Sequence, residues 1–222
     1  MGPDEVVVTF RTDADQVVTT AVGASEVTTT GRFHSARVTG LEPETPYRLQ
    51  VDGAVPSLLL PAEVTTMARP SGRLVATFAT ANDVHFGEIE CGRIGGDEEV
   101  GPIFSVEPGE MSYPEVMNHG AIDEMIALRP DTVVVKGDLT DRGTEQEYDA
   151  FCAAYGRLGE RMHHIRGNHD AMITTSIAAH GPFSIELDGV TLAVLDTVVP
   201  GVDRGALDSR QLEWLDELAA ET

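Results

Sequence analysis

Three short polar clusters in this 222-residue sequence contain the side-chain types that hold metal ions. They are Asn-Asp-Val-His at 82–85, Gly-Asp-Leu-Thr-Asp-Arg-Gly at 137–143 and Gly-Asn-His-Asp at 167–170. Carboxylates and amide oxygens mixed with imidazole suit Mn, Fe or Zn better than calcium. Each cluster alone is typical of a capped loop or a turn, so the prediction of a metal site depends on all three meeting in space.

Four residues of these clusters are the candidate ligands. Asp83 and His85 are two residues apart, so an irregular loop can aim both side chains at one cation. Asp138 offers two carboxylate oxygens that can bridge two ions, and Asn168 offers a carbonyl oxygen. Glycines within the second and third clusters allow the backbone to turn sharply beside the ligands.

Each cluster directly follows a predicted strand, at 74–80, 132–135 and 162–165. Predicted helices at 118–128 and 145–158 alternate with these strands, which indicates a mostly parallel α/β sheet. Ligands of open α/β sheets bind outside the carboxyl ends of the strands, so the three clusters should lie together there. The remaining predicted elements are strands at 183–187 and 191–195 and a helix at 208–220.

Residues 1–70 have a different sequence pattern from the rest of the chain: short β-rich runs alternate with turn residues, and no helical periodicity appears. This pattern predicts a small all-β sandwich. Within it, Leu41–Tyr47 reads Leu-x-Pro-x-Thr-x-Tyr and resembles the entry to strand F of fibronectin type III domains, where the tyrosine bonds to upstream backbone. Another small β-sandwich is the alternative. Residues 68–73 read as a linker, which predicts domains at 1–70 and 71–222.

The composition is strongly acidic, with 37 Asp and Glu against 15 basic residues and a net charge of −22. Nucleic-acid duplexes and anionic membranes are bound by clustered basic residues, so neither partner is expected. Two cysteines form no disulfide framework, and no apolar run approaches the ~18 residues of a membrane span. No signal peptide is visible, which favours a cytoplasmic protein. The alternative is a secreted protein whose signal peptide has been removed, because its sequence would show the same N-terminal pattern.

The three motifs DxH, GDLTDRG and GNHD, in this order and at this spacing, resemble those of the calcineurin-like metallophosphoesterase family. The resemblance covers residues 74–222. The similarity is greatest to the branch of cyclic-nucleotide phosphodiesterases and glycerophosphodiesterases, which residues 205–215 also resemble. An N-terminal fibronectin-like domain resembles the arrangement of purple acid phosphatases, although their GDxxY motif is absent from this sequence.

The resemblance implies a role for each matching residue. Asp83 and His85 would hold a first metal ion, Asp138 would bridge it to a second, and Asn168 would hold the second. His169 would face the phosphate as general acid or charge stabiliser, and Asp170 would orient its ring. Asp141 and Arg142 would support the ligands by hydrogen bonds.

The function implied is that of a metal-dependent phosphoesterase that hydrolyses small phosphodiesters with a hydroxide held by two divalent or trivalent ions, Mn, Fe or Zn. The alternatives are a phosphomonoesterase and a non-catalytic, metal-poor interaction module. The family's later ligand motifs follow a helix like that at 208–220 and are absent from this sequence. We therefore expect the N-terminal portion of a phosphoesterase, weak or inactive by itself, with a C-terminal fragment or a second chain completing the site.

Residues outside the motifs are expected to contribute less to chemistry. Phe86–Glu115 reads as a solvated insertion or a specificity loop, and Cys91 within it as structural. His163 and His164 lie in a predicted strand and are expected to pack in the interior, whereas His34 is expected at the surface.

Overall fold

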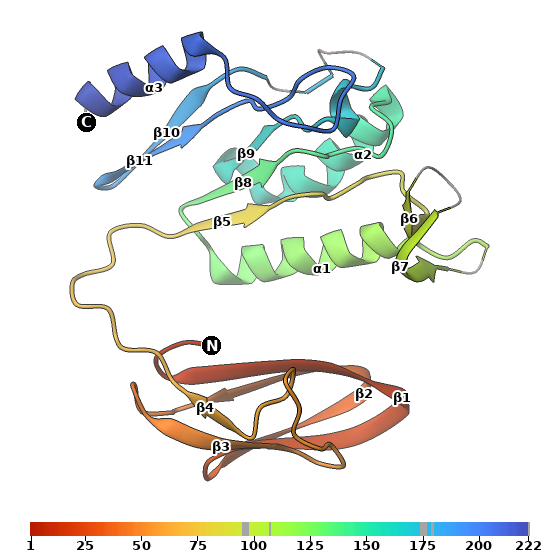
Figure 1. Cartoon of the computed structure of the whole chain (residues 1–222), viewed down its shortest axis with the longest axis vertical. Helices are drawn as coiled ribbons and strands as arrows, with labels where there is room; N and C mark the ends of the chain where they lie inside the picture. Colours follow the sequence, from red (N-terminus) through yellow and green to blue (C-terminus); the bar gives the residue numbers. More distant parts are fainter. Residues whose placement is uncertain (95–97, 107, 174–176, 179, 222) are drawn as a thin grey trace. The chain divides into compact units, whose positions relative to one another are not determined.

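The computed structural model describes residues 1–94, 98–106, 108–173, 177–178 and 180–221. The chain forms two compact units, Met1–Arg73 and Leu74–Thr222 (Figure 1). No helix of the described residues is long and apolar enough to cross a membrane.

The first unit is all β. Its four strands form one antiparallel sheet in the order β2-β1-β3-β4, with β1 at Glu5–Val22, β2 at Ser25–Thr39, β3 at Pro46–Val51 and β4 at Glu63–Thr65. The sequence predicted two stacked sheets, but the early β-rich runs join into one long hairpin whose register shifts between Arg11 and Gln16. The Tyr47 hydroxyl accepts a hydrogen bond from the Glu42 backbone N–H at 2.8 Å, as the fibronectin resemblance implies. The fibronectin-like assignment itself stays a prediction.

His34 is buried in this unit, contrary to the surface position expected for it. Its ring stacks on Phe10, with centroids 4.5 Å apart, and its Nδ1 lies 2.8 Å from the Thr29 hydroxyl. His34 lies opposite Phe10 across the β1–β2 pair, and this cross-strand contact covers the imidazole.

The second unit contains the predicted parallel sheet. Strands β5 (Phe78–Ala81), β8 (Thr132–Lys136) and β9 (Met162–Ile165) lie in the order β5-β8-β9, and both pairings are parallel. Helix α1 (Tyr113–Leu128) connects the first two strands, and helix α2 (Glu145–Tyr155) with the 3-10 turn η1 (Gly156–Arg161) connects the second two. The three polar clusters therefore follow the carboxyl ends of three adjacent strands.

The helix boundaries follow from local chemistry. Thr144 and Glu147 form a capping box at the start of α2, where the Thr144 hydroxyl accepts from the Glu147 N–H and the Glu147 carboxylate from the Thr144 N–H. Helix α1 begins five residues earlier than predicted, because Ser112 and Pro114 supply a helix start.

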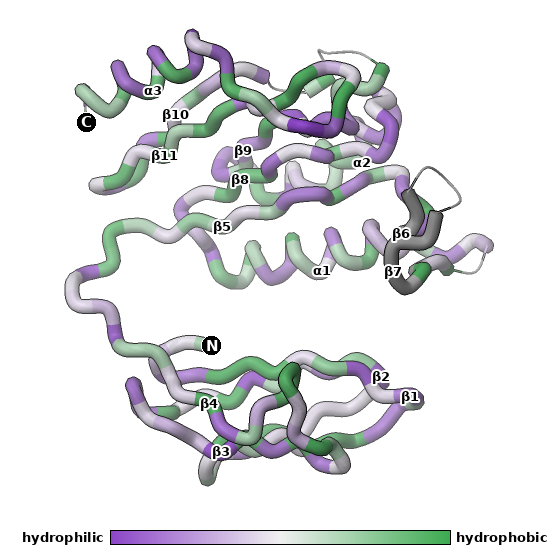
Figure 2. Tube along the Cα trace, in the orientation of Figure 1, coloured by the Kyte–Doolittle hydropathy of each residue, from purple (hydrophilic) through white to green (hydrophobic). Residues whose placement is uncertain are grey.

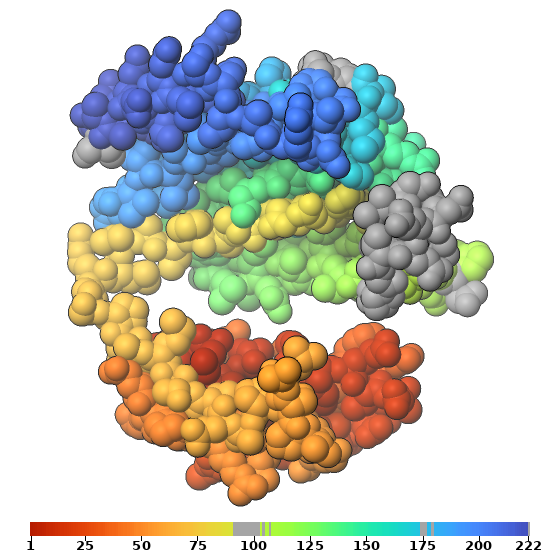
Figure 3. Space-filling model, viewed as in Figure 1, coloured from red at the N-terminus to blue at the C-terminus, as the bar shows by residue number. Residues whose placement is uncertain are grey.

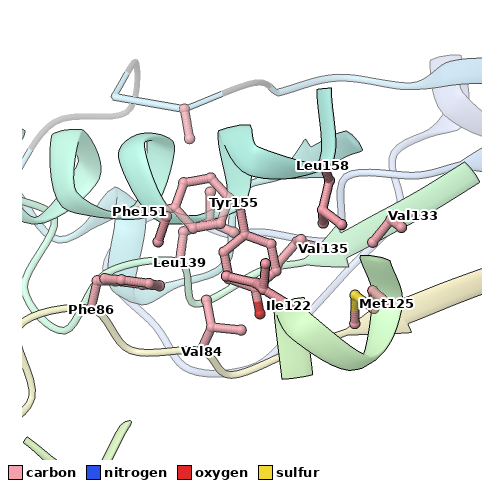
Figure 4. Close-up of a cluster of buried hydrophobic side chains, with 12 residues drawn as sticks. Val84, Phe86, Ile122, Met125, Val133, Val135, Leu139, Phe151, Tyr155 and Leu158 are labelled. Atoms are coloured by element: carbon pink, nitrogen blue, oxygen red, sulfur yellow. The ribbon is translucent and has the colours of Figure 1, made fainter. Parts of the chain in front are cut away.

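One face of the sheet carries the hydrophobic core. The alternating residues Val133 and Val135 of β8 are fully buried against both helices (Figure 4). The other members of this cluster include Ile122 and Met125 from α1 and Phe151, Tyr155 and Leu158 from α2 and η1. Both helices thus cover the same face of β8, and Val134 and Lys136 point to the opposite face.

The remaining elements of this unit are two hairpins, a short 3-10 turn and a helix. They are β6 (Glu90–Ile94) with β7 (Glu98–Ser105), β10 (Phe183–Leu187) with β11 (Val190–Val194), the short turn η2 (His169–Ala171) and α3 (Ser209–Glu221). The predicted insertion thus contains a hairpin, and the Cys91 side chain lies outside the described residues. Helix α3 mixes hydrophobic and hydrophilic residues along its length and lies at the surface of the unit, with none of its side chains buried (Figures 2 and 3).

Candidate metal centre

Backbone hydrogen bonds join the first cluster to the second beyond the ends of their strands. The His85 N–H donates to the Asp138 carbonyl at 2.9 Å, and the Phe86 N–H donates to the Leu139 carbonyl at 3.0 Å. The Asp141 N–H returns a bond to the Phe86 carbonyl at 2.9 Å. Because these bonds continue the parallel pairing, the DxH segment is fixed beside Asp138 without belonging to a strand.

Three of the predicted ligands have left-handed backbone conformations. The φ angles are 55° at Asp83, 43° at His85 and 46° at Asp138. Among the described residues only two other non-glycine residues, Glu44 and Arg129, have positive φ. Such conformations are unfavourable for residues with a Cβ and persist where the surrounding structure holds them, often at functional sites.

The third cluster is joined to the second through the carboxylate of Asp170, which is fully buried. Its Oδ1 accepts from the Thr140 N–H and hydroxyl at 2.9 and 2.7 Å. Its Oδ2 accepts from the Leu139 N–H at 3.1 Å and the Gly167 N–H at 2.6 Å. Three of these bonds join the third cluster to the second, and the bond from Gly167 lies within the third cluster. The carboxylate is therefore used in holding the loops, whereas the resemblance implied that Asp170 orients the His169 ring.

Two glycines allow the second and third clusters to touch. A Cβ at Gly167 would collide with the carboxylate and the backbone nitrogen of Asp138, and a Cβ at Gly137 would lie 3.0 Å from the Gly167 Cα. Gly137 also has a φ of 74°. The close approach of two backbones beside Asp138 thus requires glycine at both positions.

A buried amide supports the first cluster from behind. Asn118 of α1 donates from Nδ2 to the Val84 carbonyl at 2.6 Å and accepts from the Tyr155 hydroxyl at 2.9 Å. Val84 stands between Asp83 and His85, so this contact fixes the backbone that carries both. The sequence analysis did not single out Asn118. Asn118 stands four positions before Ile122, on the apolar face of the helix, and a polar residue on that face indicates a buried hydrogen-bonding role.

The imidazole of His169 is oriented by a backbone carbonyl. Its Nδ1 lies 2.6 Å from the Asp141 carbonyl oxygen. A carbonyl only accepts, so Nδ1 carries the proton and Nε2 is left for another partner. The His169 backbone N–H donates to Asp138 Oδ1 at 3.1 Å. Asp141 therefore supports the site through its backbone, whereas its carboxylate pairs with the exposed Arg142 side chain at 3.1 Å.

His85, Asp138 and His169 form a group of metal donors. His85 Nε2 lies 3.7 Å from Asp138 Oδ2, and the two imidazole centroids are 4.6 Å apart. One donor atom from each residue lies within 4.8 Å of the others. Donors on one ion at ~2.1 Å are at most ~4.2 Å apart, so a shift of less than about one ångström closes the group on a cation. His85 Nδ1 is buried without a hydrogen-bond partner among the described residues.

The structure places the other two predicted ligands at the same cavity. Asp83 and Asn168 line a cavity of about 370 Å3 together with Asp138. The Asp83 carboxylate is exposed and accepts a hydrogen bond from the neighbouring Asn82 amide. The structure thus brings His85 into contact with Asp138, adds His169 to the donor group, and leaves Asp83 and Asn168 on the cavity wall.

A buried ion pair ties the third cluster to the C-terminal helix. Arg166, next to Gly167, contacts the Asp196 carboxylate through Nε and Nη2 at 2.9 and 2.8 Å. The Gln211 side chain of α3 binds the backbone N–H and carbonyl of Asp196 at 2.8 and 2.7 Å. Sequence analysis missed Asp196, although it follows a predicted strand end just as the three clusters do.

His164 packs behind the site, as predicted for a residue of β9. Its Nε2 lies 2.9 Å from the Tyr148 hydroxyl, and its ring contacts Phe151 edge-on. Burial lowers the pKa of His164, because the charged imidazolium loses hydration. Burial likewise raises the pKa of Tyr148 to about 12, so this pair is uncharged at neutral pH.

The model of the family described as calcineurin-like phosphoesterase matches residues 76–217. The chain therefore belongs to the calcineurin-like phosphoesterase family, as the motifs predicted, and the α/β architecture of the second unit agrees with this. Members of this family use divalent metal ions, which the donor group at His85, Asp138 and His169 fits.

Curated relatives with similar sequences are named as phosphodiesterases. A cAMP/cGMP dual specificity phosphodiesterase of Mycobacterium tuberculosis is 35% identical over 105 residues, which cover 40% of this chain and 32% of that protein. A probable glycerophosphodiester phosphodiesterase of Arcobacter nitrofigilis is 26% identical over 125 residues, which cover 49% of this chain and 46% of that protein. The chain thus spans about a third to a half of the length of these relatives.

Among solved structures, a purple acid phosphatase from yellow lupin superposes with a TM-score of 0.41 at 14% sequence identity. The superposition covers 100% of this chain and 47% of that protein.

Proposed function

We propose that this chain carries the metal site of a phosphodiesterase that hydrolyses small phosphodiesters with two metal ions, Mn, Fe or Zn. The observation that carries the proposal is the approach of His85 Nε2 to Asp138 Oδ2, at 3.7 Å, beyond the ends of adjacent parallel strands, with Asp83 and Asn168 on the cavity that Asp138 lines. The names of the relatives, which act on cyclic nucleotides or glycerophosphodiesters, favour diesters over monoesters.

In this proposal Asp83 and His85 would hold one ion, Asn168 would hold the other, and Asp138 would contribute to both. The ions, when bound, neutralise phosphate charge and lower the pKa of water. The His169 ring lies beside that of His85, and the Asp141 carbonyl fixes the proton on its Nδ1, which leaves Nε2 for the substrate. A second proton on Nε2 can pass to the departing alkoxide, which assigns His169 as general acid.

The proposal also keeps the expected partners and location. The substrate is a small phosphoester, and a segment or second chain beyond these residues supplies further ligands to the second ion. The acidic composition supports a protein that binds neither a nucleic-acid duplex nor a membrane. A cytoplasmic location is kept as part of the proposal.

Calorimetric titration of the metal-free protein with Mn2+, followed by an assay on bis(p-nitrophenyl) phosphate, tests the proposal. Asp138→Asn should abolish both metal binding and hydrolysis, because one bridging oxygen is lost. His169→Gln should bind Mn2+ within a few-fold of the wild-type affinity but lower the rate by roughly 10²–10⁴-fold. Asp216→Asn, at an exposed position of α3, is the control and should change neither. Wild-type protein that binds no Mn2+, or hydrolysis that survives in Asp138→Asn, would refute the assignment.

A further inference from the structure

The cavity beside the donor group contains positive charge as well as metal ligands. Besides Asp83, Asp138 and Asn168, its lining includes one further acid, Asp203, and the basic residues Lys136, Arg166 and Arg204. They come from three different segments: the end of β8, the residue after β9 and the loop that follows β11. Three cations on one cavity are unexpected in a chain with only 15 basic residues and a net charge of −22.

Lys136 is placed at this cavity by strand geometry. It ends β8, where alternation sends Val133 and Val135 into the helix-covered core and Val134 and Lys136 to the opposite face. Both Val134 and Lys136 line the cavity. Lys136 is the only lysine of the sequence, it is exposed, and no ion pair to it exists among the described residues. Its ammonium group is therefore available to a ligand.

The two arginines differ in availability. Arg166 already neutralises the buried Asp196 carboxylate at 2.8 Å, so its charge is largely used within the protein. Arg204 is exposed and has no ion pair within the described part of the chain. Lys136 and Arg204 are thus the two cations that can act on a bound molecule.

A single phosphodiester group does not account for both cations. It carries one negative charge, which the metal ions would receive in the proposed site, so neither cation is needed for that charge. A second anionic group on the substrate would be repelled by the acidic surface of the protein unless local cations receive it.

We propose that Lys136 and Arg204 form an anion subsite that receives a second phosphate of the substrate, next to the scissile diester. The substrate class is then a nucleotide-like phosphodiester with an additional phosphate monoester. This inference rests on the proposed function and specifies the substrate of the same site.

The test compares two ligands that differ by one phosphate, thymidine 5′-monophosphate and thymidine 3′,5′-bisphosphate. Binding to the full chain is measured by calorimetry at low salt, with and without Mn2+. Exposed charge pairs contribute modestly, so two cations should favour the bisphosphate by about 5- to 20-fold. Lys136→Gln and Arg204→Gln should each lower this ratio by about 2- to 5-fold, and the pair together should bring it near one. Arg73→Gln, at an exposed arginine of the first unit, is the control and should leave the ratio unchanged.

The outcomes separate this inference from the proposed function. If Mn2+ binds and bis(p-nitrophenyl) phosphate is hydrolysed but the two ligands bind equally, or neither binds measurably, the subsite is refuted and the phosphodiesterase stands. A preference for the bisphosphate that persists in the Lys136→Gln, Arg204→Gln double variant also overturns it. If no metal binds, the proposed function fails, and the metal-free titration still shows whether the subsite exists. A preference that declines as salt is raised supports the charge-based origin.

Discussion

Replacing Asp170 by asparagine distinguishes a structural role from a catalytic one. In the structure its carboxylate accepts four hydrogen bonds from Leu139, Thr140 and Gly167, and it is fully buried. All four partners are donors, so the site needs a group that only accepts. An asparagine keeps one oxygen and presents an NH2 group where the other oxygen stood.

The cost of this change can be estimated from the bonds that are lost. When the NH2 group takes the place of Oδ2, the backbone N–H groups of Leu139 and Gly167 face a donor; when it takes the place of Oδ1, the Thr140 N–H does. Each buried donor left without an acceptor costs about 1–3 kcal/mol, and the retained bonds weaken because the acceptor is no longer charged. Loss of the buried charge offsets part of this, so Asp170→Asn should destabilise the second unit by about 2–4 kcal/mol.

Urea denaturation followed by tryptophan fluorescence measures this loss, because the single tryptophan, Trp214, lies in the second unit. Hydrogen exchange should also accelerate at the amides that lose their acceptor: those of Leu139 and Gly167 if the NH2 group replaces Oδ2, or that of Thr140 if it replaces Oδ1. Asp216→Asn, at an exposed position of α3, is the control and should stay within about 0.5 kcal/mol of the wild type. An Asp170→Asn protein with unchanged stability and exchange but a reduced rate of hydrolysis would refute this reasoning and restore the ring-orienting role.

Three further substitutions test the supports of the site. Gly167→Ala should weaken Mn2+ binding at least tenfold because the new Cβ displaces a ligand, whereas Gly120→Ala, with nothing within 4 Å, should stabilise α1 by about 0.5–1 kcal/mol; equal metal affinities would contradict this. Asn118→Leu should cost about 2–4 kcal/mol in urea unfolding and weaken Mn2+ binding, because the Val84 carbonyl loses its donor; stability without change would show that water replaces the amide. The pKa of His164 is lowered by folding, so the unfolded chain binds more protons below about pH 6.5 and stability should fall as pH decreases through that region; His164→Asn should flatten this slope, and identical slopes would be inconsistent with a buried neutral imidazole.

Local patterns in the sequence were sufficient to predict where the candidate ligands stand. The run Val133–Val135 indicates a strand buried on both faces, and the glycine and polar residues after it mark its carboxyl end. In the same way, the sequence places Asn168 after the carboxyl end of β9 and Asp83 after that of β5. Because parallel strands present their carboxyl ends at one edge of a sheet, the sequence by itself determined that these residues share one region of the fold.

Only the tertiary structure decided which atoms meet within that region. Asn118 reaches the Val84 carbonyl across 34 positions of sequence, and Asp170 reaches Thr140 across 30. His169 is oriented by the Asp141 carbonyl rather than by its neighbour Asp170. Periodicity and turn residues specify the conformation of a segment, but they contain no information on which rotamer faces a loop 30 residues away. That choice depends on how α1, α2 and the three strands pack, because packing sets which buried donors and acceptors must be satisfied.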